Sequence, residues 1–275
     1  MSRKKSRLTI TLSPDLLDRL DRAVDREGLQ NRSRAIETYL RRVLRPTVGQ
    51  AVILAGGAPS GGRMPALDPI AGRPLILHML RHLVDSGVRS VVVLAGESEP
   101  AVRRLVGSGE SLGASVRYLP EPELRGTAGA LKLAEPLLAG EPFLVLHGDI
   151  LTDIDLGEFA RFHFDEGSLA TIAVKPRQSE PRYGQVMLQG NRITRFFETG
   201  RDGGISIVNT GVYLFQPGIF GLIDPRDPTQ LETDVFPLLA ETGELSAFLF
   251  QGIWYDISTP ANYRRAEQRW SERGA

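Results

Sequence analysis

Ala51-Val-Ile-Leu-Ala-Gly-Gly57 is the most informative stretch of this sequence. Its apolar residues predict a buried strand, and the two glycines predict a tight turn at the carboxyl end of that strand. Because glycine has no Cβ, backbone N–H groups in such a turn can closely approach a phosphate or a base edge. The motif by itself leaves two interpretations open, a nucleotide site and a simple turn, and the rest of the sequence must decide between them.

The composition excludes several classes of protein. Of 275 residues, 41% are hydrophobic and 24% are charged, which is typical of a folded globular protein. The absence of cysteine excludes disulfides, thiolate catalysis and cysteine-bound metal, and the four histidines are scattered. No apolar run is long enough to span a bilayer, and no apolar signal segment follows the basic N-terminus. We therefore expect a cytoplasmic protein with no membrane partner.

The formal net charge of zero conceals two oppositely charged parts. Residues 1–45 carry 12 Lys/Arg and 6 Asp/Glu, whereas the rest of the chain carries 21 and 27. A basic appendage joined to an acidic body indicates two separate functions. We therefore expect a small domain at residues 1–45, a linker at 46–50 and a larger domain at 51–275.

The first 45 residues read as a strand followed by two helices. Residues 7–12 alternate between polar and apolar, which predicts a strand with one wet face. Ser13-Pro14-Asp15 predicts the start of a helix that ends at Gly28, and Asn31-Arg-Ser-Arg34 predicts the start of a second helix. Such short elements, without disulfides or metal, cannot bury their own apolar faces, so we expect a dimer.

This order of elements resembles the ribbon-helix-helix DNA-binding family over residues 5–45. The resemblance implies a homodimer on double-stranded DNA, in which two strands pair antiparallel and their outward side chains read base edges. It also implies that the N-terminus of the second helix binds a phosphate. The implied DNA-binding residues are Arg7, Thr9, Thr11, Asn31, Arg32 and Ser33. The alternative is a dimerisation module with a solvated basic face.

In the body, apolar runs alternate with helical segments. Strands are predicted at residues 51–54, 90–94, 142–146, 169–174, 207–215 and 246–250. The alternation predicts an α/β fold with a doubly wound, mostly parallel sheet. Gly56-Gly57 and Gly148-Asp149 follow two of these strands, and ligands in such folds bind at the carboxyl ends of strands.

Several short motifs occur in the order found in sugar nucleotidyltransferases. They are Ala51-Val-Ile-Leu-Ala-Gly-Gly57, Ile70-Ala-Gly-Arg-Pro-Leu75, Gly126-Thr-Ala-Gly-Ala-Leu131, Gly148-Asp-Ile-Leu-Thr-Asp153, Tyr183-Gly184, Asn209-Thr-Gly211 and Trp254-Tyr-Asp-Ile-Ser-Thr-Pro260. The body resembles the group that contains mannose-1-phosphate guanylyltransferases and glucose-1-phosphate nucleotidyltransferases. Such enzymes have a Rossmann-like nucleotide-diphospho-sugar transferase fold, and they join a sugar 1-phosphate to a nucleoside triphosphate with release of pyrophosphate.

The resemblance also implies roles for individual residues. Asp149 and Asp256 would bind Mg²⁺, which neutralises charge during phosphoryl transfer and takes one or two carboxylates as ligands. The alternative is a strand-end cap for Asp149 and a surface turn for Asp256. The implied nucleotide and sugar contacts are Ala55, Gly56, Gly57, Gly126, Thr127, Gly129, Tyr183, Gly184, Glu198 and Asn209.

The chain departs from the family pattern at the loop after the glycine turn. Residues 58–65 are roughly half a dozen residues short against the family motif, which ends in a Pro-Lys pair. Pro65 stands where that lysine belongs, and Thr199 replaces a second lysine. Arg63 is a candidate catalytic replacement for the loop arginine. Further cations that could substitute are Lys132, Lys175, Arg125 and Arg73.

Three functions remain open on these residues. The first is a DNA-binding regulator whose body binds a nucleotide, sugar phosphate or nucleotide-sugar, with catalysis weakened or lost. The second is an active Mg²⁺-dependent enzyme that makes a nucleotide-sugar. In the third, the body only packs subunits together, because a fold does not guarantee an activity.

Overall fold

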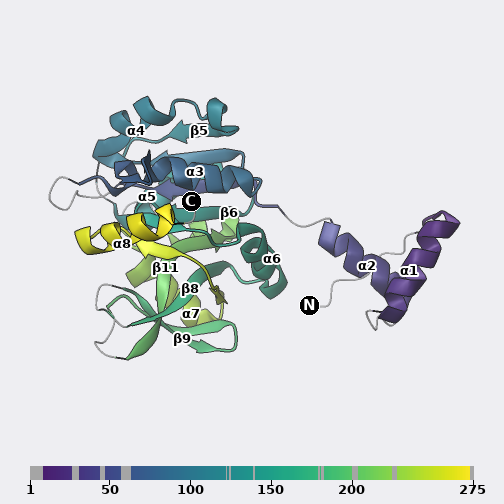
Figure 1. Cartoon of the computed structure of the whole chain (residues 1–275). Helices are drawn as coiled ribbons and strands as arrows, with labels where there is room; N and C mark the ends of the chain where they lie inside the picture. Colours follow the sequence, from purple (N-terminus) through teal and green to yellow (C-terminus); the bar gives the residue numbers. More distant parts are fainter. Residues whose placement is uncertain are drawn as a thin grey trace. The chain divides into compact units, whose positions relative to one another are not determined.

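The computed structural model divides the chain into two compact units, Met1–Pro46 and Thr47–Ala275, called here the smaller and the larger unit (Figure 1). The residues that the structure describes are 9–26, 31–43, 47–56, 63–121, 123, 125–138, 140–178, 180, 183–199, 204–224 and 228–272. Of the candidate site residues, Arg7 and Gly57 lie outside these ranges.

Two helices make up the described part of the smaller unit: α1, Pro14–Arg26, and α2, Arg32–Val43. Both begin where the sequence predicts. The Ser13 hydroxyl accepts a hydrogen bond from the Leu16 N–H at 3.4 Å, and Asn31 Oδ1 accepts one from the Arg34 N–H at 2.9 Å. These side chains satisfy amide groups that the first turn of a helix otherwise leaves unpaired.

The strand predicted at residues 7–12 is not present in the described part of this single chain. Residues 9–13 have no regular secondary structure. A strand needs a hydrogen-bonded neighbour, and the predicted neighbour is the same segment of a second copy. The prediction of a strand is therefore not met over residues 9–12 of one chain, and residues 7 and 8 lie outside the described ranges.

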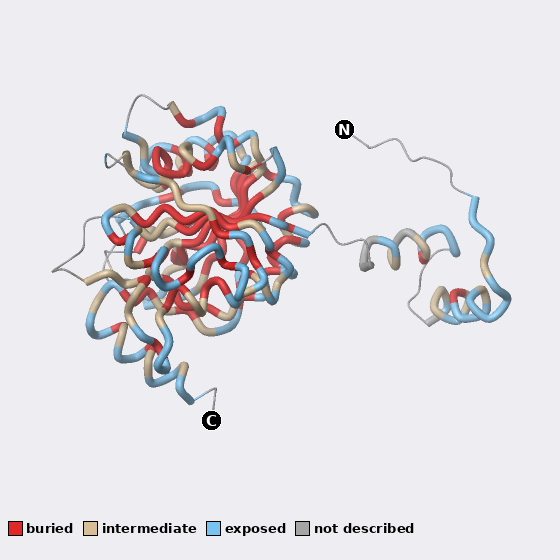
Figure 2. The backbone as a smooth tube through the Cα atoms, turned by 90° about the horizontal axis from the view of Figure 1, so that it is seen from above, coloured by how far each residue is buried: buried red, intermediate tan, exposed pale blue. Residues whose placement is uncertain are grey.

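The smaller unit buries little of its apolar surface within one chain. Leu20 and Ala35 are buried, but Ile10, Leu16 and Leu40 are 45%, 45% and 42% exposed. Figure 2 shows the contrast, since red buried segments fill the larger unit and are sparse in the smaller one. Its apolar faces are thus largely uncovered.

The larger unit is built on a nine-stranded sheet in the order β5-β4-β1-β6-β11-β8-β12-β10-β9. Its strands are β1 Gln50–Leu54, β4 Ser90–Leu94, β5 Ser115–Tyr118, β6 Phe143–His147, β8 Ala170–Gln178, β9 Gln185–Gln189, β10 Arg192–Phe197, β11 Ile205–Phe215 and β12 Leu245–Leu249. Two small antiparallel pairs accompany it: β7 Ile150–Thr152 with β13 Trp254–Asp256, and β2 Pro69–Ile70 with β3 Arg73–Pro74.

The sheet is mixed, which corrects the prediction of a mostly parallel one. Strands β5, β4, β1 and β6 are parallel neighbours, as are β8 and β12. Strand β11, however, runs antiparallel to both β6 and β8, and β10 runs antiparallel to β9 and β12. Only Gly190 and Asn191 separate β9 from β10. Such a connection is too short for the crossover that a parallel pair needs, so this part forms hairpins.

Helices cover both faces of the sheet. One hydrophobic cluster contains residues of α3 Leu75–Asp85, α4 Glu99–Val106, α6 Leu156–Glu166 and α8 Pro260–Ser271. The other cluster contains residues of α5 Gly126–Ala134 and α7 Phe236–Thr242. Strand residues alternate between the clusters: Ile53 belongs to the first and Val52 to the second. The larger unit is therefore a three-layer α/β/α structure.

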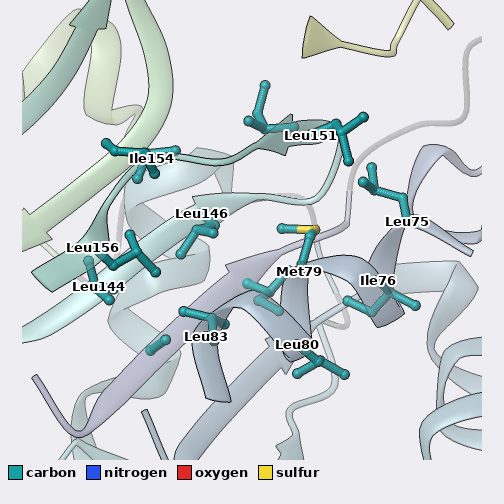
Figure 3. Close-up of a cluster of buried hydrophobic side chains, with 14 of the residues drawn as sticks. Leu75, Ile76, Met79, Leu80, Leu83, Leu144, Leu146, Leu151, Ile154 and Leu156 are labelled. Atoms are coloured by element: carbon teal, nitrogen blue, oxygen red, sulfur yellow. The ribbon is translucent and has the colours of Figure 1, made fainter. Parts of the chain in front are cut away.

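Five apolar residues of α3 show how the first cluster is packed. They are Leu75, Ile76, Met79, Leu80 and Leu83, all buried. In Figure 3 they lie against Leu144 and Leu146 of β6, and against residues of the segment that follows it. Spacings of three and four residues bring these side chains to one helix face. This packing holds the carboxyl end of β6, where the candidate site begins.

Candidate functional site

A pocket of about 240 Å³ lies where β1 and β6 end. The sequence predicted a site at these strand ends, because parallel strands bring their carboxyl termini to one edge of a sheet. The described residues that line the pocket are Leu54, Ala55, Gly56, Arg63, Met64, Pro65, Ala66, Glu97, Ser98, Thr127, His147, Gly148, Asp149 and Ser258.

The end of β6 leaves no room for a side chain at Gly148, whereas the nearest group at Gly56 is the end of the Glu121 side chain, which can move. A Cβ on Gly148 would lie 2.6 Å from the Cα of Ala55, and one on Gly56 would lie 2.5 Å from Oε2 of Glu121. The Ala55 N–H donates to the carbonyl of Leu94 at 2.7 Å, and the Gly148 N–H donates to that of Leu54 at 2.8 Å. The two turns therefore pack against each other and form one wall of the pocket.

Asp149 and Asp256 are brought together by β7 and β13. Asp256 pairs with Ile150 across these strands, and the Ile257 N–H donates to the carbonyl of Asp149 at 2.9 Å. The Asp256 carboxylate accepts a hydrogen bond from the Ser258 N–H at 2.8 Å. The residue Asp256 as a whole is buried, with 9% of its surface exposed. Two acids more than a hundred residues apart in sequence are thus neighbours, and of the two Asp149 is among the described residues that line the pocket.

The proximity of these acids has an electrostatic consequence. Burial raises the pKa of Asp149, and the neighbouring Asp256 carboxylate raises it further against an opposing contribution from His147. Removing water from a carboxylate and placing a second one beside it both disfavour the charged form. A divalent cation between them would reverse this effect, because it favours the ionised acids.

The donor set of the pocket fits Mg²⁺ better than a metal held entirely by the protein. The described residues contain no group of three or more His, Asp or Glu side chains that could hold a metal ion. Mg²⁺ usually takes one or two carboxylates and completes its shell with water and substrate phosphates. Asp149 and Asp256 offer such a pair.

Helix α5 begins at Gly126, but its first amide groups are already engaged. The Thr127 N–H donates to Oε1 of Gln230 at 2.9 Å, and the Gly129 N–H donates to the carbonyl of Thr229 at 3.1 Å. Thr127 lines the pocket, whereas Gly126 and Gly129 do not. A Cβ on Gly126 would lie 2.5 Å from the Thr229 carbonyl oxygen, and one on Gly129 would lie 2.7 Å from Cβ of Arg125. The two glycines thus serve close packing in this structure.

The four predicted sugar contacts lie away from the described lining of the pocket. Tyr183 is buried, and its hydroxyl accepts a hydrogen bond from Asn262 at 3.0 Å. A Cβ on Gly184 would lie 2.9 Å from the ring of Phe196. Asn209 donates to the hydroxyl of Tyr213 at 2.9 Å. Glu198, the fourth, is exposed.

A partly buried carboxylate that the sequence did not reveal connects one of these residues to the pocket. Glu232 accepts hydrogen bonds from the Thr127 hydroxyl at 2.7 Å and the Tyr213 hydroxyl at 3.3 Å. It also lies 3.6 Å from Nε2 of His147, which lines the pocket. His147 could have been noticed because it precedes Gly148-Asp149 directly. Glu232 had no such signal, because its contact with Thr127 spans 105 positions.

Positive charge is sparse at the pocket. Arg63 is the only lysine or arginine among its described lining residues, and Pro65 lines it at the place of the expected lysine. The Arg63 guanidinium is paired with the Asp68 carboxylate and lies 5.2 Å from the centre of the Tyr263 ring. The predicted substitutes Lys132 and Lys175 donate instead to backbone carbonyls outside the pocket.

Neither Arg125 nor Arg73 is among the described residues that line the pocket. Arg125 forms an ion pair with Glu123 at 3.3 Å, and Arg73 is exposed on β3. None of the four cations that the sequence offered as replacements therefore reaches the described pocket wall.

In the smaller unit, some candidate DNA-binding residues are exposed, whereas others already make hydrogen bonds within the chain. Thr9, Thr11 and Ser33 are exposed, and Asn31 caps α2. Arg32 is engaged, because its guanidinium donates two hydrogen bonds of 2.6 Å to the carboxylate of Asp21 on α1. The structure thus places Arg32 in a contact between helices.

The fold and the site together define an α/β protein with a pocket where β1 and β6 end and with two neighbouring acids, one of which lines that pocket. Residues 50–273 match the family described as Nucleotidyl transferase, so the chain belongs to that family. Residues 6–45 match the family described as Ribbon-helix-helix protein, copG family. The resemblances drawn from short motifs are thereby confirmed for both parts of the chain.

Known relatives include mannose-1-phosphate guanylyltransferases. The catalytic subunit beta of this enzyme from Danio rerio is 34% identical over 225 residues, which are 78% of this chain and 62% of that protein. The mannose-1-phosphate guanyltransferase of Aspergillus oryzae is 32% identical over 226 residues, with the same coverage of both chains. This chain thus spans less than two thirds of the length of these relatives.

Solved structures share the fold of the larger unit. A putative glucose-1-phosphate thymidylyltransferase from Bacillus anthracis, in complex with a sucrose, has a TM-score of 0.74 at 22% identity over 81% of this chain and 96% of its own. HddC from Yersinia pseudotuberculosis, complexed with GMP-PN, has a TM-score of 0.71 at 26% identity over 81% of this chain and 100% of its own. Among the described residues, no helix has the length and apolar character needed to cross a membrane.

Proposed function

We propose that this chain is a DNA-binding regulator whose nucleotidyl transferase unit binds a nucleotide, a sugar phosphate or a nucleotide-sugar, with catalysis weakened or lost. The observation that carries the proposal is the charge of the pocket wall. Asp149 lines the pocket and has Asp256 as its neighbour, but the only lysine or arginine in the described lining is Arg63, which is already paired with Asp68.

The shortage of positive charge should lower the rate of phosphoryl transfer more than the affinity for a nucleotide. Transfer between two phosphate groups gathers negative charge, and fixed cations hold the attacking and leaving groups in line. The loss of one such contact commonly costs about 2.7–4 kcal/mol, or 10²–10³ in rate. Backbone groups and a bound metal can still hold a nucleotide when these side chains are missing.

Asp149 and Asp256 would hold Mg²⁺ in this proposal. The ion would neutralise phosphate charge when it is bound. The protein contributes the position of the two carboxylates, which the pairing of β7 with β13 fixes. The Gly56 and Gly148 turns contribute the close approach of the backbone.

The proposed role of the smaller unit is to bind double-stranded DNA as a homodimer. The match to the ribbon-helix-helix family and the exposed polar side chains of Thr9 and Thr11 support this role. The apolar surface that one chain leaves uncovered supports the dimer. In this arrangement Arg7, Thr9 and Thr11 read base edges, and the start of α2 binds a phosphate.

Pyrophosphate release from purified protein tests the proposal for the larger unit. The assay contains Mg²⁺, a panel of nucleoside triphosphates and a panel of sugar 1-phosphates, and calorimetry measures binding of the same ligands. We expect binding with little or no turnover. Turnover that Asp149→Asn abolishes and the exposed control Asp165→Asn preserves would contradict the loss of catalysis.

DNA binding is tested with duplexes that the intact protein selects from a random pool. The variant Arg7→Ala/Thr9→Ala/Thr11→Ala should lose preference for the selected sequence. Unchanged preference would refute base reading by this segment. Absence of any nucleotide or sugar ligand in calorimetry would instead support a body that only packs subunits together.

The second candidate function is an active Mg²⁺-dependent sugar nucleotidyltransferase. The juxtaposition of Asp149 and Asp256 favours it, because a pocket that only binds ligand has less need for two neighbouring acids. The same pyrophosphate assay decides between the candidates. A second proposed role for the smaller unit, dimerisation alone, belongs with this alternative.

A further inference from the structure

A second pocket of about 430 Å³ lies on the larger unit between β8, β13 and α8. It shares no described lining residue with the pocket at Asp149. Its charged lining residues are Lys175, Arg177, Arg269 and Glu272, and its aromatic ones are Trp254 and Tyr255. Three cations against one carboxylate give this pocket the opposite charge balance from the first.

Lys175 and Arg177 lie two positions apart on β8, so both side chains leave the same face of the strand. Burial lowers the pKa of Lys175, the Asp153 carboxylate raises it, and the neighbouring Arg177 lowers it. The Asp153 carboxylate is itself engaged by the Ile253 N–H at 2.6 Å. The two cations thus repel each other across a partly desolvated space.

Arg177 is positioned by aromatic rings and retains its hydrogen-bonding groups. Its guanidinium carbon lies 5.0 Å from the centre of the Trp254 ring and 5.6 Å from that of Tyr183. A cation–π contact of this kind does not need the N–H donors of the guanidinium, which can therefore bind another group. Arg177 makes no hydrogen bond or ion pair with any residue that the structure describes.

The Lys175 side chain, which also lines this pocket, is positioned by one hydrogen bond and one aromatic ring. The Lys175 ammonium donates one hydrogen bond to the carbonyl of Gly252 at 2.6 Å and lies 4.9 Å from the centre of the Phe250 ring. An ammonium has three donors, so the contact with Gly252 leaves others for a ligand. A fixed guanidinium edge beside an ammonium matches a tetrahedral oxyanion with several acceptor oxygens.

We infer that the pocket at Lys175, Arg177 and Trp254 binds a phosphate or pyrophosphate group of a small molecule, as a site separate from the pocket at Asp149. Phosphate and pyrophosphate share the chemistry that the pocket recognises, and the experiment distinguishes them. An oxyanion there relieves the repulsion between Lys175 and Arg177. The inference does not depend on the nucleotidyl transferase unit being active.

Tryptophan fluorescence gives a local readout of this site. The chain has two tryptophans, Trp254 at the pocket and Trp270 on α8. In a Trp270→Phe background, Trp254 is the remaining one, and an anion that engages Arg177 changes the charge stacked on its ring. Full-length protein is titrated with inorganic phosphate and with pyrophosphate in EDTA, so that no metal–pyrophosphate complex contributes. Calorimetry on the unsubstituted chain provides an independent affinity.

We expect saturable binding of at least one anion that weakens as salt is added. Arg177→Ala should lower the affinity about tenfold or more, and Arg177→Lys should restore only part of it, since lysine lacks the planar donor edge. Arg195→Ala removes an exposed arginine on β10 and should leave the affinity unchanged. Circular dichroism checks that each variant is folded.

Two results would overturn the inference. One is the absence of binding for both anions at millimolar concentration in folded, unsubstituted protein. The other is binding that Arg63→Ala abolishes and Arg177→Ala preserves, since that pattern assigns the anion to the first pocket. If Arg177→Ala fails to fold, Lys175→Ala and Arg177→Lys carry the same comparison, and unchanged affinity in both counts against the site.

Discussion

The two units differ in how much of their structure one chain completes. The larger unit buries apolar side chains on both faces of its sheet, including the fully buried Phe159 and Phe215. The smaller unit buries Leu20 and Ala35 among its described residues and leaves Ile10, Leu16 and Leu40 exposed. The larger unit is therefore a finished domain, whereas the smaller one needs a second surface to cover its apolar face.

A substitution that creates a cavity in the core of the larger unit should have the largest effect on stability. Phe159 on α6 is fully buried, and its ring centre lies 5.3 Å from that of Phe248. Phe159→Ala should lower the free energy of unfolding of this unit by about 3–5 kcal/mol, because it removes buried apolar surface and leaves a cavity. Both tryptophans are in this unit, so denaturant unfolding followed by tryptophan fluorescence reports it.

Phe197→Ala provides the matched control, since Phe197 is 42% exposed on β10. It should change the free energy of unfolding by no more than about 0.5 kcal/mol. A loss below 1 kcal/mol for Phe159→Ala would show that the core of the larger unit is not closed. Helix loss in the smaller unit at the same denaturant concentration would show that the two units unfold together.

A buried histidine gives the larger unit a pH dependence. His163 is fully buried, and burial lowers its pKa from 6.5 to about 4. One ring nitrogen lies 2.9 Å from the Gln216 amide nitrogen, which must donate, so the other nitrogen donates to the Thr171 hydroxyl at 2.7 Å. Both ring nitrogens are then satisfied only in the neutral histidine.

Stability should therefore fall as pH drops from 6.5 to about 4. In that window the unfolded chain binds a proton that the folded chain resists, and the difference amounts to roughly 3 kcal/mol at the acid end. His163→Gln should flatten this part of the curve of unfolding free energy against pH, whatever its effect at neutral pH. An equal slope in both proteins would refute the assignment.

For the smaller unit, the comparison predicts a marked effect from an exposed residue. Leu40 on α2 is 42% exposed in one chain, and Leu105 on α4 is 41% exposed. If a second copy covers Leu40, Leu40→Ser should weaken self-association by roughly 1.5–3 kcal/mol per protomer, and Leu105→Ser should not. Sedimentation over a range of concentrations measures the association. Equal behaviour of the two variants would remove the argument for a covered apolar face.

The sequence predicted best what short stretches of chain determine. The strand at residues 51–54 and the helix starts at Ser13 and Asn31 each depend on a few neighbouring residues. Asp149 and Asp256 were predicted through family motifs, and the structure places them side by side.

What the sequence missed depends on distant pairing. Strands β9 and β10 have no long apolar run, and their stability comes from cross-strand partners. Strand β11 pairs antiparallel with β6 and with β8, and the apolar pattern of its own residues does not indicate this direction. Glu232 contacts the pocket residue Thr127 because the helical turn Leu231–Val235, distant in sequence, folds against α5, which no local pattern records.

The smallest expected effect concerns Arg32, and it decides whether that side chain contacts DNA or only joins two helices. In the structure its guanidinium makes a bidentate contact with Asp21, although both side chains are largely exposed, at 57% and 42%. Exposed pairs contribute little to stability. Salt dependence of DNA affinity separates the two roles, because each phosphate contact contributes about one unit to the slope against the logarithm of salt concentration.

If Arg32 only positions α1 against α2, Arg32→Ala and Asp21→Asn should weaken DNA binding to a similar, small extent, with an unchanged salt slope. The double variant should then be no worse than either single one. If Arg32 exchanges Asp21 for a phosphate, Arg32→Ala should reduce the slope by about one unit, and Asp21→Asn should strengthen binding. Asp18→Asn removes an exposed acid from the same helix, one turn earlier. It corrects for the general loss of negative charge, so only the excess effect of Asp21→Asn reports on Arg32.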